Sequence, residues 1–155
     1  TDSENNRFQK MIAVVKEINR RMIDNNIMLT STISYGKFAY NQRFEFIGIE
    51  KNELSGHAYL EAYLDNSFGQ PKISPGMCRI LKENLPEVIV NSIQNRNDDI
   101  FKLISEKPRH KNHYYFYWMV NDKNEINNFE QRYRTCSEYS KYAGMIKALK
   151  GENCL

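Results

Sequence analysis

The stretch SGHAYLEAYLDN, residues 55–66, predicts a helix over residues 55–65 that has one side almost bare of side chains. Ala58 and Ala62 are four residues apart, and residues at i and i+4 share one face of a helix. Gly56 prolongs this small-residue strip at the start of the helix. Such a strip lets the helix approach another backbone closely, and a leucine at either alanine would overpack that contact. Packing is the simplest explanation of the pattern.

The other sides of this helix carry larger residues. Tyr59 and Tyr63 are placed where their hydroxyl groups can reach water or an interface, and Leu60 and Leu64 are expected to face the core. Ser55 is the expected N-cap, because its side-chain oxygen can accept a hydrogen bond from an amide of the first turn.

Upstream of this helix, the sequence predicts another helix and a pair of strands. Apolar residues recur at helical spacing over residues 7–24, which predicts an amphipathic helix. Residues 27–35 alternate between core-facing and outward positions, which predicts a half-buried strand. FEFIGIE, residues 44–50, predicts a second strand, and the two strands are expected to form a hairpin across a break at residues 41–43.

Downstream, five segments carry secondary-structure signals. A proline suited to the first turn of a helix predicts one over residues 75–84, whereas residues 87–93 fit a strand or a helix. DDIFKLISEK, residues 98–107, predicts a helix. HYYFYWMV, residues 113–120, predicts a strand covered on both faces. Apolar residues at helical spacing between positions 126 and 146 predict a long C-terminal helix.

The composition is that of a folded domain. The chain has 155 residues, of which 41% are hydrophobic and 26% are charged, so a single domain over residues 1–155 is expected. The order of elements favours an α+β fold with helices packed on one face of a mostly antiparallel sheet, such as a partial ferredoxin-like sheet. The net charge of +3 is too small to argue for nucleic acid, and no apolar run is long enough for a membrane span.

The cysteines indicate a reducing compartment. Cys78, Cys136 and Cys154 are odd in number, widely spaced and lack a C-x-x-C pairing, so we expect reduced thiols in a cytoplasmic protein. His110 and His113 have no nearby cysteine partners, which excludes a zinc-type spacing.

Three segments together resemble the class III nucleotidyl cyclases, and most closely the prokaryotic branch that makes cyclic pyrimidine nucleotides in phage defence. STISYGKF, residues 31–38, resembles the family's strand of the type R-G-x-I-[ST]-Y-G. LSGHAYLEAYLDN, residues 54–66, resembles its glycine-led helix, and KISPGMCRILKENLP, residues 72–86, occupies the place of the segment that follows. The resemblance implies an enzyme that converts a nucleoside triphosphate to a cyclic nucleotide and works as a homodimer.

The same resemblance implies that the metal site lies outside this chain. In the family, two acidic residues on strands ahead of the first helix hold Mg²⁺ or Mn²⁺, and nothing before Phe8 can form those strands. Asp2 echoes a metal-binding [ST]-D-[ST] motif, but a frayed terminus is the plainer interpretation. Leu60 and Leu64 stand where other cyclases place an Asn and an Arg, a pair that the pyrimidine branch also lacks. We therefore expect the C-terminal portion of a longer cyclase-like protein, inactive alone and binding no metal.

The resemblance assigns no catalytic residue to this chain, but it implies a substrate-binding or interface surface at the strand end and the glycine-led helix. The residues of that surface are Tyr35, Gly36, Lys37, Gly56, His57, Ala58 and Ala62. Lys37 is more simply explained as a solvated lysine, and His57 as a surface histidine.

Two further functions stay open beside the enzyme. The same fold without its metal site would be a binding or regulatory module that senses a partner or a nucleotide. A small RNA-contacting domain is the third, because Arg109, His110, Lys111 and His113 lie among aromatic residues. A charged loop before a buried strand explains that last cluster more simply.

Overall fold

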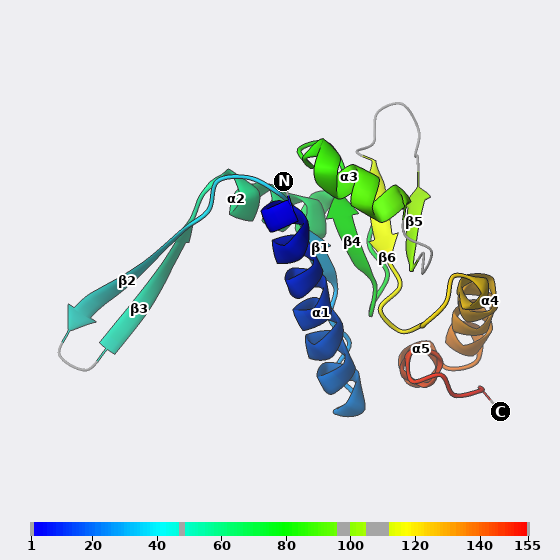
Figure 1. The fold of residues 1–155 in the computed structure, drawn as a ribbon. Coiled ribbons are helices and arrows are strands. Elements are labelled where there is room, and N and C mark those ends of the chain that lie inside the picture. Colours follow the sequence, from blue (N-terminus) through cyan, green and yellow to red (C-terminus); the bar gives the residue numbers. More distant parts are fainter. Residues whose placement is uncertain (1, 47–48, 96–99, 105–111, 155) are drawn as a thin grey trace.

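A computed structural model of the chain describes residues 2–46, 49–95, 100–104 and 112–154. Figure 1 shows the arrangement of its helices and strands. In chain order these are α1 Asp2–Asp24, β1 Ser31–Ile33, β2 Ala39–Phe46, β3 Ile49–Ser55, α2 His57–Phe68, β4 Cys78–Leu81, α3 Glu87–Gln94, β5 Phe101–Ile104, β6 His113–Phe116, α4 Asn124–Tyr139 and α5 Lys141–Leu149.

Four strands form one mixed sheet in the order β1-β4-β6-β5. β1 runs parallel to β4, with Ser31 opposite Cys78, while β6 is antiparallel to both β4 and β5. β2 and β3 form a separate antiparallel hairpin, which projects away from the rest of the molecule (Figure 1). The predicted α+β class and the mostly antiparallel pairing are therefore confirmed.

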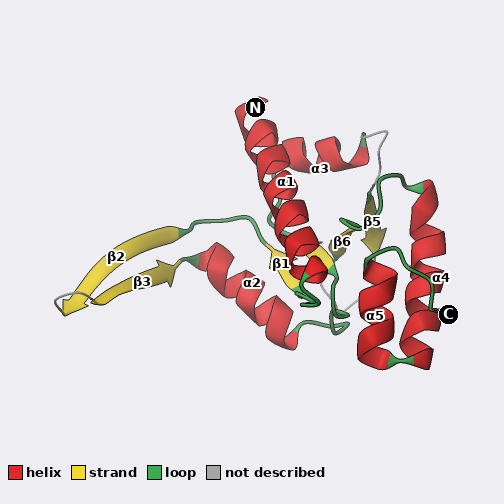
Figure 2. Ribbon diagram, turned by 90° about the horizontal axis from the view of Figure 1, so that it is seen from below, coloured by secondary structure: helices red, strands yellow, loops and turns green. Residues whose placement is uncertain are grey.

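Helices cover both faces of the four-stranded sheet. On one face Ile80 lies in the hydrophobic core with residues of α1 and α3, and the ring centroids of Phe8 and Phe101 are 6.3 Å apart. Because successive strand residues point to opposite faces, Arg79 points the other way, where it contacts Asp65 of α2. Figure 2 shows α2 and α3 on opposite sides of β1. The prediction that all helices pack on one face is therefore wrong.

The last two helices pack at the end of the sheet where β4 begins. Trp118 Nε1 donates a 2.8 Å hydrogen bond to the carbonyl oxygen of Gly76, and the Tyr133 hydroxyl donates a 2.7 Å bond to that of Pro75. Phe129 of α4 and Leu149 of α5 are buried in the same core. The predicted long C-terminal helix is thus two helices, which meet at Ser140.

The helix predicted over residues 75–84 is wrong, because its proline belongs to a turn. The amide of Met77 donates a 3.1 Å bond to the carbonyl of Ser74, and Gly76 has a φ of 81°. Pro followed by a Gly at positive φ is the signature of a type II turn. This turn delivers the chain into β4, whose four residues are all buried.

Three other segments differ from their predictions. β1 pairs with β4 rather than with the segment 44–50. Of that segment, residues 44–46 belong to β2 and residues 49–50 to β3, and the break predicted at residues 41–43 is wrong because β2 runs through it. Within the segment 98–107, the predicted helix is wrong where it is described, because Phe101–Ile104 is β5. β6 ends at Phe116, so only the first half of the strand predicted over residues 113–120 is present. The ambiguous segment 87–93 is helical, in α3.

The prediction of three reduced thiols is wrong at two positions. Cys136 of α4 and Cys154 near the C-terminus form a disulfide across 18 residues of sequence. Cys78 is a free thiol in the core, and burial raises its pKa to about 12. Within the described ranges, every helix is too short or too polar to cross a membrane.

Candidate ligand pocket at the end of β1

The chain that leaves β1 packs directly on the start of α2. The amide of Ala58 donates a 3.2 Å hydrogen bond to the carbonyl oxygen of Lys37, and the Ser34 hydroxyl donates to the carbonyl oxygen of Ala58. A Cβ placed on Gly36 would lie 3.5 Å from the Ala58 side chain. The close backbone approach predicted for the small-residue strip therefore occurs at Ala58, and the chain's own segment 34–37 occupies it.

Gly56 lies in the same contact between segment 34–37 and the start of α2. It is the N-cap of α2 at φ 123°, a conformation that L side chains rarely adopt, and a Cβ there would lie 2.4 Å from the carbonyl oxygen of Lys37. Ser55 is therefore not the N-cap that the sequence predicts, because the residue after it takes that position and makes no side-chain cap. Glycine is required here by both its φ and the lack of space.

The remaining residues of the predicted surface do not form one site. Lys37 and His57 are exposed, and His57 Nε2 lies 3.8 Å from Glu61 Oε1 on the same helix. Ala62 faces a different hollow, between α1 and α2. Leu60 and Leu64 are exposed rather than core-facing, which corrects their predicted placement. Only Tyr35 reaches a pocket beside the strand end.

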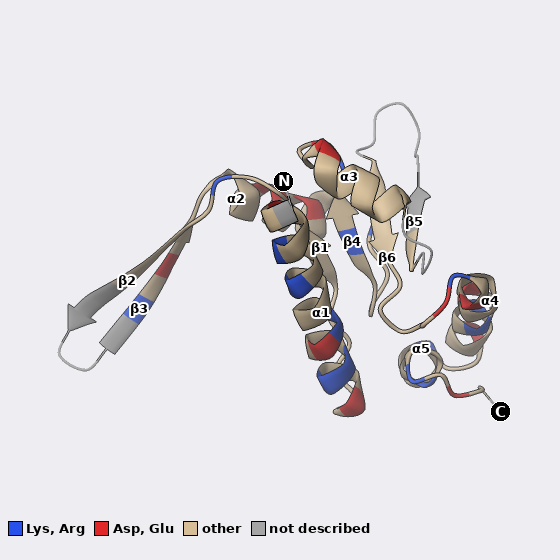
Figure 3. Cartoon of the chain, viewed as in Figure 1, with Lys and Arg blue, Asp and Glu red and all other residues tan. Residues whose placement is uncertain are grey.

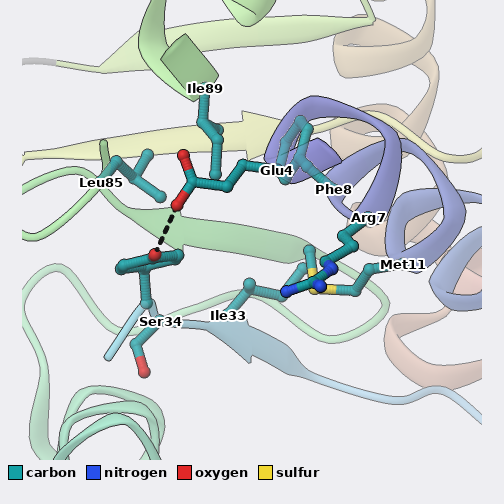
Figure 4. Close-up of a pocket in the computed structure, with 9 residues that line it drawn as sticks. Glu4, Arg7, Phe8, Met11, Ile33, Ser34, Leu85 and Ile89 are labelled. Carbon is teal, nitrogen blue, oxygen red and sulfur yellow. Dashed lines mark hydrogen bonds between the residues drawn. The ribbon is translucent and has the colours of Figure 1, made fainter. Parts of the chain in front are cut away.

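That pocket lies between α1, the end of β1 and the segment that leads into α3, and Figure 4 shows it from the side. Its volume is about 170 Å³. The side chains that line it are Glu4, Arg7, Phe8, Met11, Ile33, Ser34, Tyr35, Leu85 and Ile89. Apolar groups therefore form most of its wall, and the polar groups come from the first turns of α1 and from the end of β1.

The polar side of the pocket combines both charges with a phenol. The Tyr35 hydroxyl donates a 3.2 Å hydrogen bond to Glu4 Oε1, the dashed line in Figure 4. Arg7 lies one helical turn further along α1 and is exposed. Phe8 and Ile89 are buried and fix the apolar wall. The pocket can hold a small flat apolar group with a hydrogen-bonding or anionic end directed at Arg7.

Sequence reasoning missed both charged residues of the pocket. The predicted helix covers residues 7–24, whereas α1 begins at Asp2, so Glu4 is helical as well as Arg7. A signal was present, because Glu4, Phe8 and Met11 follow the i, i+4, i+7 spacing of one helical face. Asp2, for which a frayed terminus is the plainer interpretation, is instead the first residue of α1.

A second polar cluster is buried beneath α2 and holds the sheet to it. Arg79 donates from Nε to Asp65 Oδ2 at 2.7 Å, from Nη2 to the Asp65 carbonyl at 2.7 Å and from Nη1 to the Pro71 carbonyl at 2.6 Å. His113 Nε2 lies 3.0 Å from Asp65 Oδ1. All three guanidinium nitrogens of Arg79 are thus hydrogen-bonded to protein oxygens, and we interpret the cluster as structural.

The environment of Asp65 favours its carboxylate form. Burial by itself raises its pKa, but the hydrogen bond with His113, the positive charge of Arg79 and the further electrostatic interaction with His113 outweigh burial, so the pKa lies below its usual 3.8. His113, one member of the predicted RNA-contacting cluster, is fully buried in β6 and is therefore not on the surface. Arg109, His110 and Lys111, the other members of the predicted RNA-contacting cluster, lie outside the described residues.

The distribution of charged residues and the grouping of possible metal ligands limit which kinds of site the described residues can form. Figure 3 shows that basic and acidic residues are interspersed along α1 rather than gathered by sign. In the part of the chain that the structure describes, no three His, Cys, Asp or Glu side chains are grouped as a metal site. Within the described residues, no such group is available to hold the Mg²⁺ or Mn²⁺ that the cyclase resemblance implies. Comparisons with protein-family models, with curated proteins and with solved structures found no match.

Proposed function

We propose that this chain is part of a nucleotidyl-cyclase-like domain, and that the pocket at the end of β1 receives the base of a nucleotide. The observation that carries this proposal is the position of the pocket. It opens at Ser34 and Tyr35, the strand end where the cyclase resemblance expects substrate contacts. Within this proposal, the antiparallel strands β4, β6 and β5 would be the part of a ferredoxin-like sheet that this chain supplies.

The size and chemistry of the pocket suit part of a nucleotide. A volume of about 170 Å³ is too small for a whole nucleotide but accommodates a single flat ring. Phe8, Ile33 and Ile89 give that ring an apolar slot, and Tyr35 with Glu4 offers hydrogen bonds to its edge. Arg7, on the exposed side, is placed to contact the sugar-phosphate portion.

Cyclisation itself requires groups beyond those described. The 3′-hydroxyl attacks the α-phosphorus and pyrophosphate leaves, and Mg²⁺ or Mn²⁺ would supply charge neutralisation in the complete domain. Because the described residues do not form such a metal site, we assign this chain binding and orientation only. Within the same proposal, the product serves prokaryotic antiviral signalling.

A homodimer completes this proposal. Three large apolar side chains are exposed on the projecting β2–β3 hairpin or next to it. Phe38 lies just before β2, Tyr40 lies on β2 and Leu54 lies on β3. An isolated two-stranded hairpin is only marginally stable in water, so packing against a second copy would stabilise it. The hairpin is therefore the surface that we assign to dimer contacts.

A second candidate is a regulatory module that binds a nucleotide without converting it. The observation that favours it is that the pocket contains one carboxylate, Glu4, which already accepts a hydrogen bond from Tyr35. Metal-dependent cyclisation needs several oxygen ligands for its cations. Both candidates require a nucleotide in the same pocket, and they differ in turnover alone.

One experiment tests both candidates. The protein encoded by the complete gene is titrated with each of the four nucleoside triphosphates by calorimetry, and is then incubated with each and Mn²⁺ to detect cyclic product. Arg7→Ala should weaken binding by roughly tenfold, the equivalent of about 1.4 kcal/mol. Arg21→Ala, an exposed arginine further along the same helix, is the matched control and should bind normally.

The outcomes separate the two functions. Binding with cyclic product supports the enzyme, and binding without product from any of the four nucleotides supports the module. Failure of all four nucleotides to bind, or equal loss in the Arg7 and Arg21 variants, overturns the assignment of the pocket.

A further inference from the structure

A second hollow runs along the outer edge of β1, between α1 and α2. Its volume is about 420 Å³, and Ile33 is the one residue that it shares with the pocket described above. Ile18 and Asn19 line it from α1, Thr32 from β1, and Tyr59, Ala62 and Tyr63 from α2. We call this hollow the β1 groove.

The floor of the β1 groove contains an unpaired sheet edge. β1 is the first strand in the order β1-β4-β6-β5, so in the described part of the chain β4 is its sole neighbour. The Ser31 amide donates to the Met77 carbonyl at 3.0 Å. Because alternate residues of a parallel strand bond to the neighbour, Ser31 and Ile33 face β4, and the N–H and C=O of Thr32 face the groove.

Two buried polar atoms in the groove lack hydrogen-bond partners. Asn19 is 3% exposed, and its Nδ2 donates 2.8 Å to the Val15 carbonyl, but its Oδ1 is buried without a donor. The Oγ1 of Thr32 is likewise buried without a partner. Buried polar atoms are nearly always hydrogen-bonded in native proteins, so an acceptor on α1 and a hydroxyl on β1 without partners favour an occupant of the groove that supplies hydrogen bonds.

The rim of the groove is apolar and uncharged. Ile18 is 48% exposed and Tyr63 is 54% exposed, on opposite walls. Ala62 stands between the tyrosines of α2, and its small side chain leaves the edge of β1 open. None of the residues that line the groove carries a charge, so an occupant with charges inside it would lose their hydration without compensation.

We infer that the β1 groove binds an extended, uncharged peptide segment of a partner protein, which adds a strand to the sheet at β1. The backbone of such a segment pairs with the N–H and C=O of Thr32, and one of its amides donates to Asn19 Oδ1. Its apolar side chains contact Ile18 and Tyr63. Strand addition of this kind satisfies the backbone edge and both unpartnered side-chain atoms, which a compact apolar ligand would leave unsatisfied.

The probe is a fluorescein-labelled decapeptide of alternating valine and threonine, titrated by fluorescence polarisation. A second peptide of the same length with proline at every other position is the control, because proline cannot donate the pairing hydrogen bonds. We expect the first peptide to bind and the proline peptide to bind at least tenfold more weakly. Ile18→Asp and Tyr63→Ser should each weaken binding at least tenfold, whereas Val14→Asp should not, since Val14 is 57% exposed on the same helix but outside the groove.

A further variant separates a binding role from a structural one. Thr32→Val removes the unpartnered hydroxyl at nearly constant volume, so it should raise the melting temperature of the free protein. The same substitution should weaken the binding of the valine-threonine peptide. A residue that served the fold alone would show no loss of peptide binding. Hydrogen exchange measured by NMR should show the Thr32 amide slowed at least tenfold by the peptide, with no change at Tyr115, which lies in an inner strand.

Four results would overturn this inference. One is absence of binding up to millimolar peptide, and another is equal binding of the proline peptide. A third is self-association in sedimentation that Ile18→Asp abolishes, which assigns the groove to a second copy. The last is slow exchange at Thr32 before peptide is added in the protein from the complete gene, which shows that its own chain covers the edge. Arg7→Ala leaves peptide binding unchanged, so this test stands apart from the nucleotide proposal.

Discussion

Arg79 and Asp65 form an ion pair in which both side chains are almost completely buried, with exposed fractions of 0% and 2% and an Nε–Oδ2 distance of 2.7 Å. Removing one partner leaves a buried charge uncompensated, which costs about 3–5 kcal/mol. Arg79→Met should therefore lower the free energy of unfolding by about that amount in urea denaturation at pH 7. The double variant Asp65→Leu/Arg79→Met should lose clearly less than the single one, and a larger loss would contradict the ion-pair account.

The same aspartate predicts a specific acid sensitivity. Its native pKa lies below 3.8, so its contribution to stability is fully present above that pH and is lost as the pH falls through the lower native pKa. Urea midpoints measured between pH 6 and pH 2 should show this loss. Asp65→Asn should flatten that part of the curve. Glu17→Gln, on the exposed face of α1, is the control and should leave the curve unchanged in shape.

Local signals in the sequence were sufficient for the two helices that frame the candidate sites. The apolar spacing of residues 7–24 predicts most of α1, and the glycine-led segment 55–65 predicts α2 within two or three residues at each end. Both depend on contacts between residues three or four apart, which a single sequence displays directly. The close approach at Ala58 was predictable for the same reason.

Long-range pairing was not predictable in this way. The partner of β1 begins at Cys78, far along the chain, and β1 itself has three residues, too few for a period-two pattern to identify its neighbour. In β4, the buried Arg79 interrupts the apolar pattern because Asp65 and Pro71 satisfy it. The pocket residue Arg7 was missed because its role depends on where α1 lies relative to β1.

The seam between segment 34–37 and α2 predicts a strong effect at one glycine and a weak effect at another. Gly56→Ala must place a Cβ 2.4 Å from the Lys37 carbonyl at φ 123°, so the free energy of unfolding should fall by about 2–4 kcal/mol. Gly36→Ala meets Ala58 at ordinary contact distance and should change stability by less than about 1 kcal/mol.

Gly151→Ala separates conformation from crowding at Gly56. Gly151 has a φ of 83°, and nothing lies within 4 Å of a Cβ built on it, so its substitution reports the cost of backbone conformation alone. Thermal unfolding of the three alanine variants should rank Gly56→Ala as the least stable, with Gly151→Ala in between. Equal melting temperatures for Gly56→Ala and Gly151→Ala would show that the contact with Lys37 does not resist displacement.

The Cys136–Cys154 disulfide ties the chain after α5 back to α4, and its removal should destabilise the protein without unfolding the sheet. A closed loop of this size contributes about 3 kcal/mol. Cys154→Ser should therefore lower the free energy of unfolding by about 2–4 kcal/mol, and dithiothreitol should lower the wild-type melting temperature but leave that of Cys154→Ser unchanged.

Cys78, buried and with its pKa raised to about 12, should resist a thiol reagent until the protein unfolds. A fast-reacting thiol in the native, unreduced protein would contradict either the disulfide or the burial of Cys78.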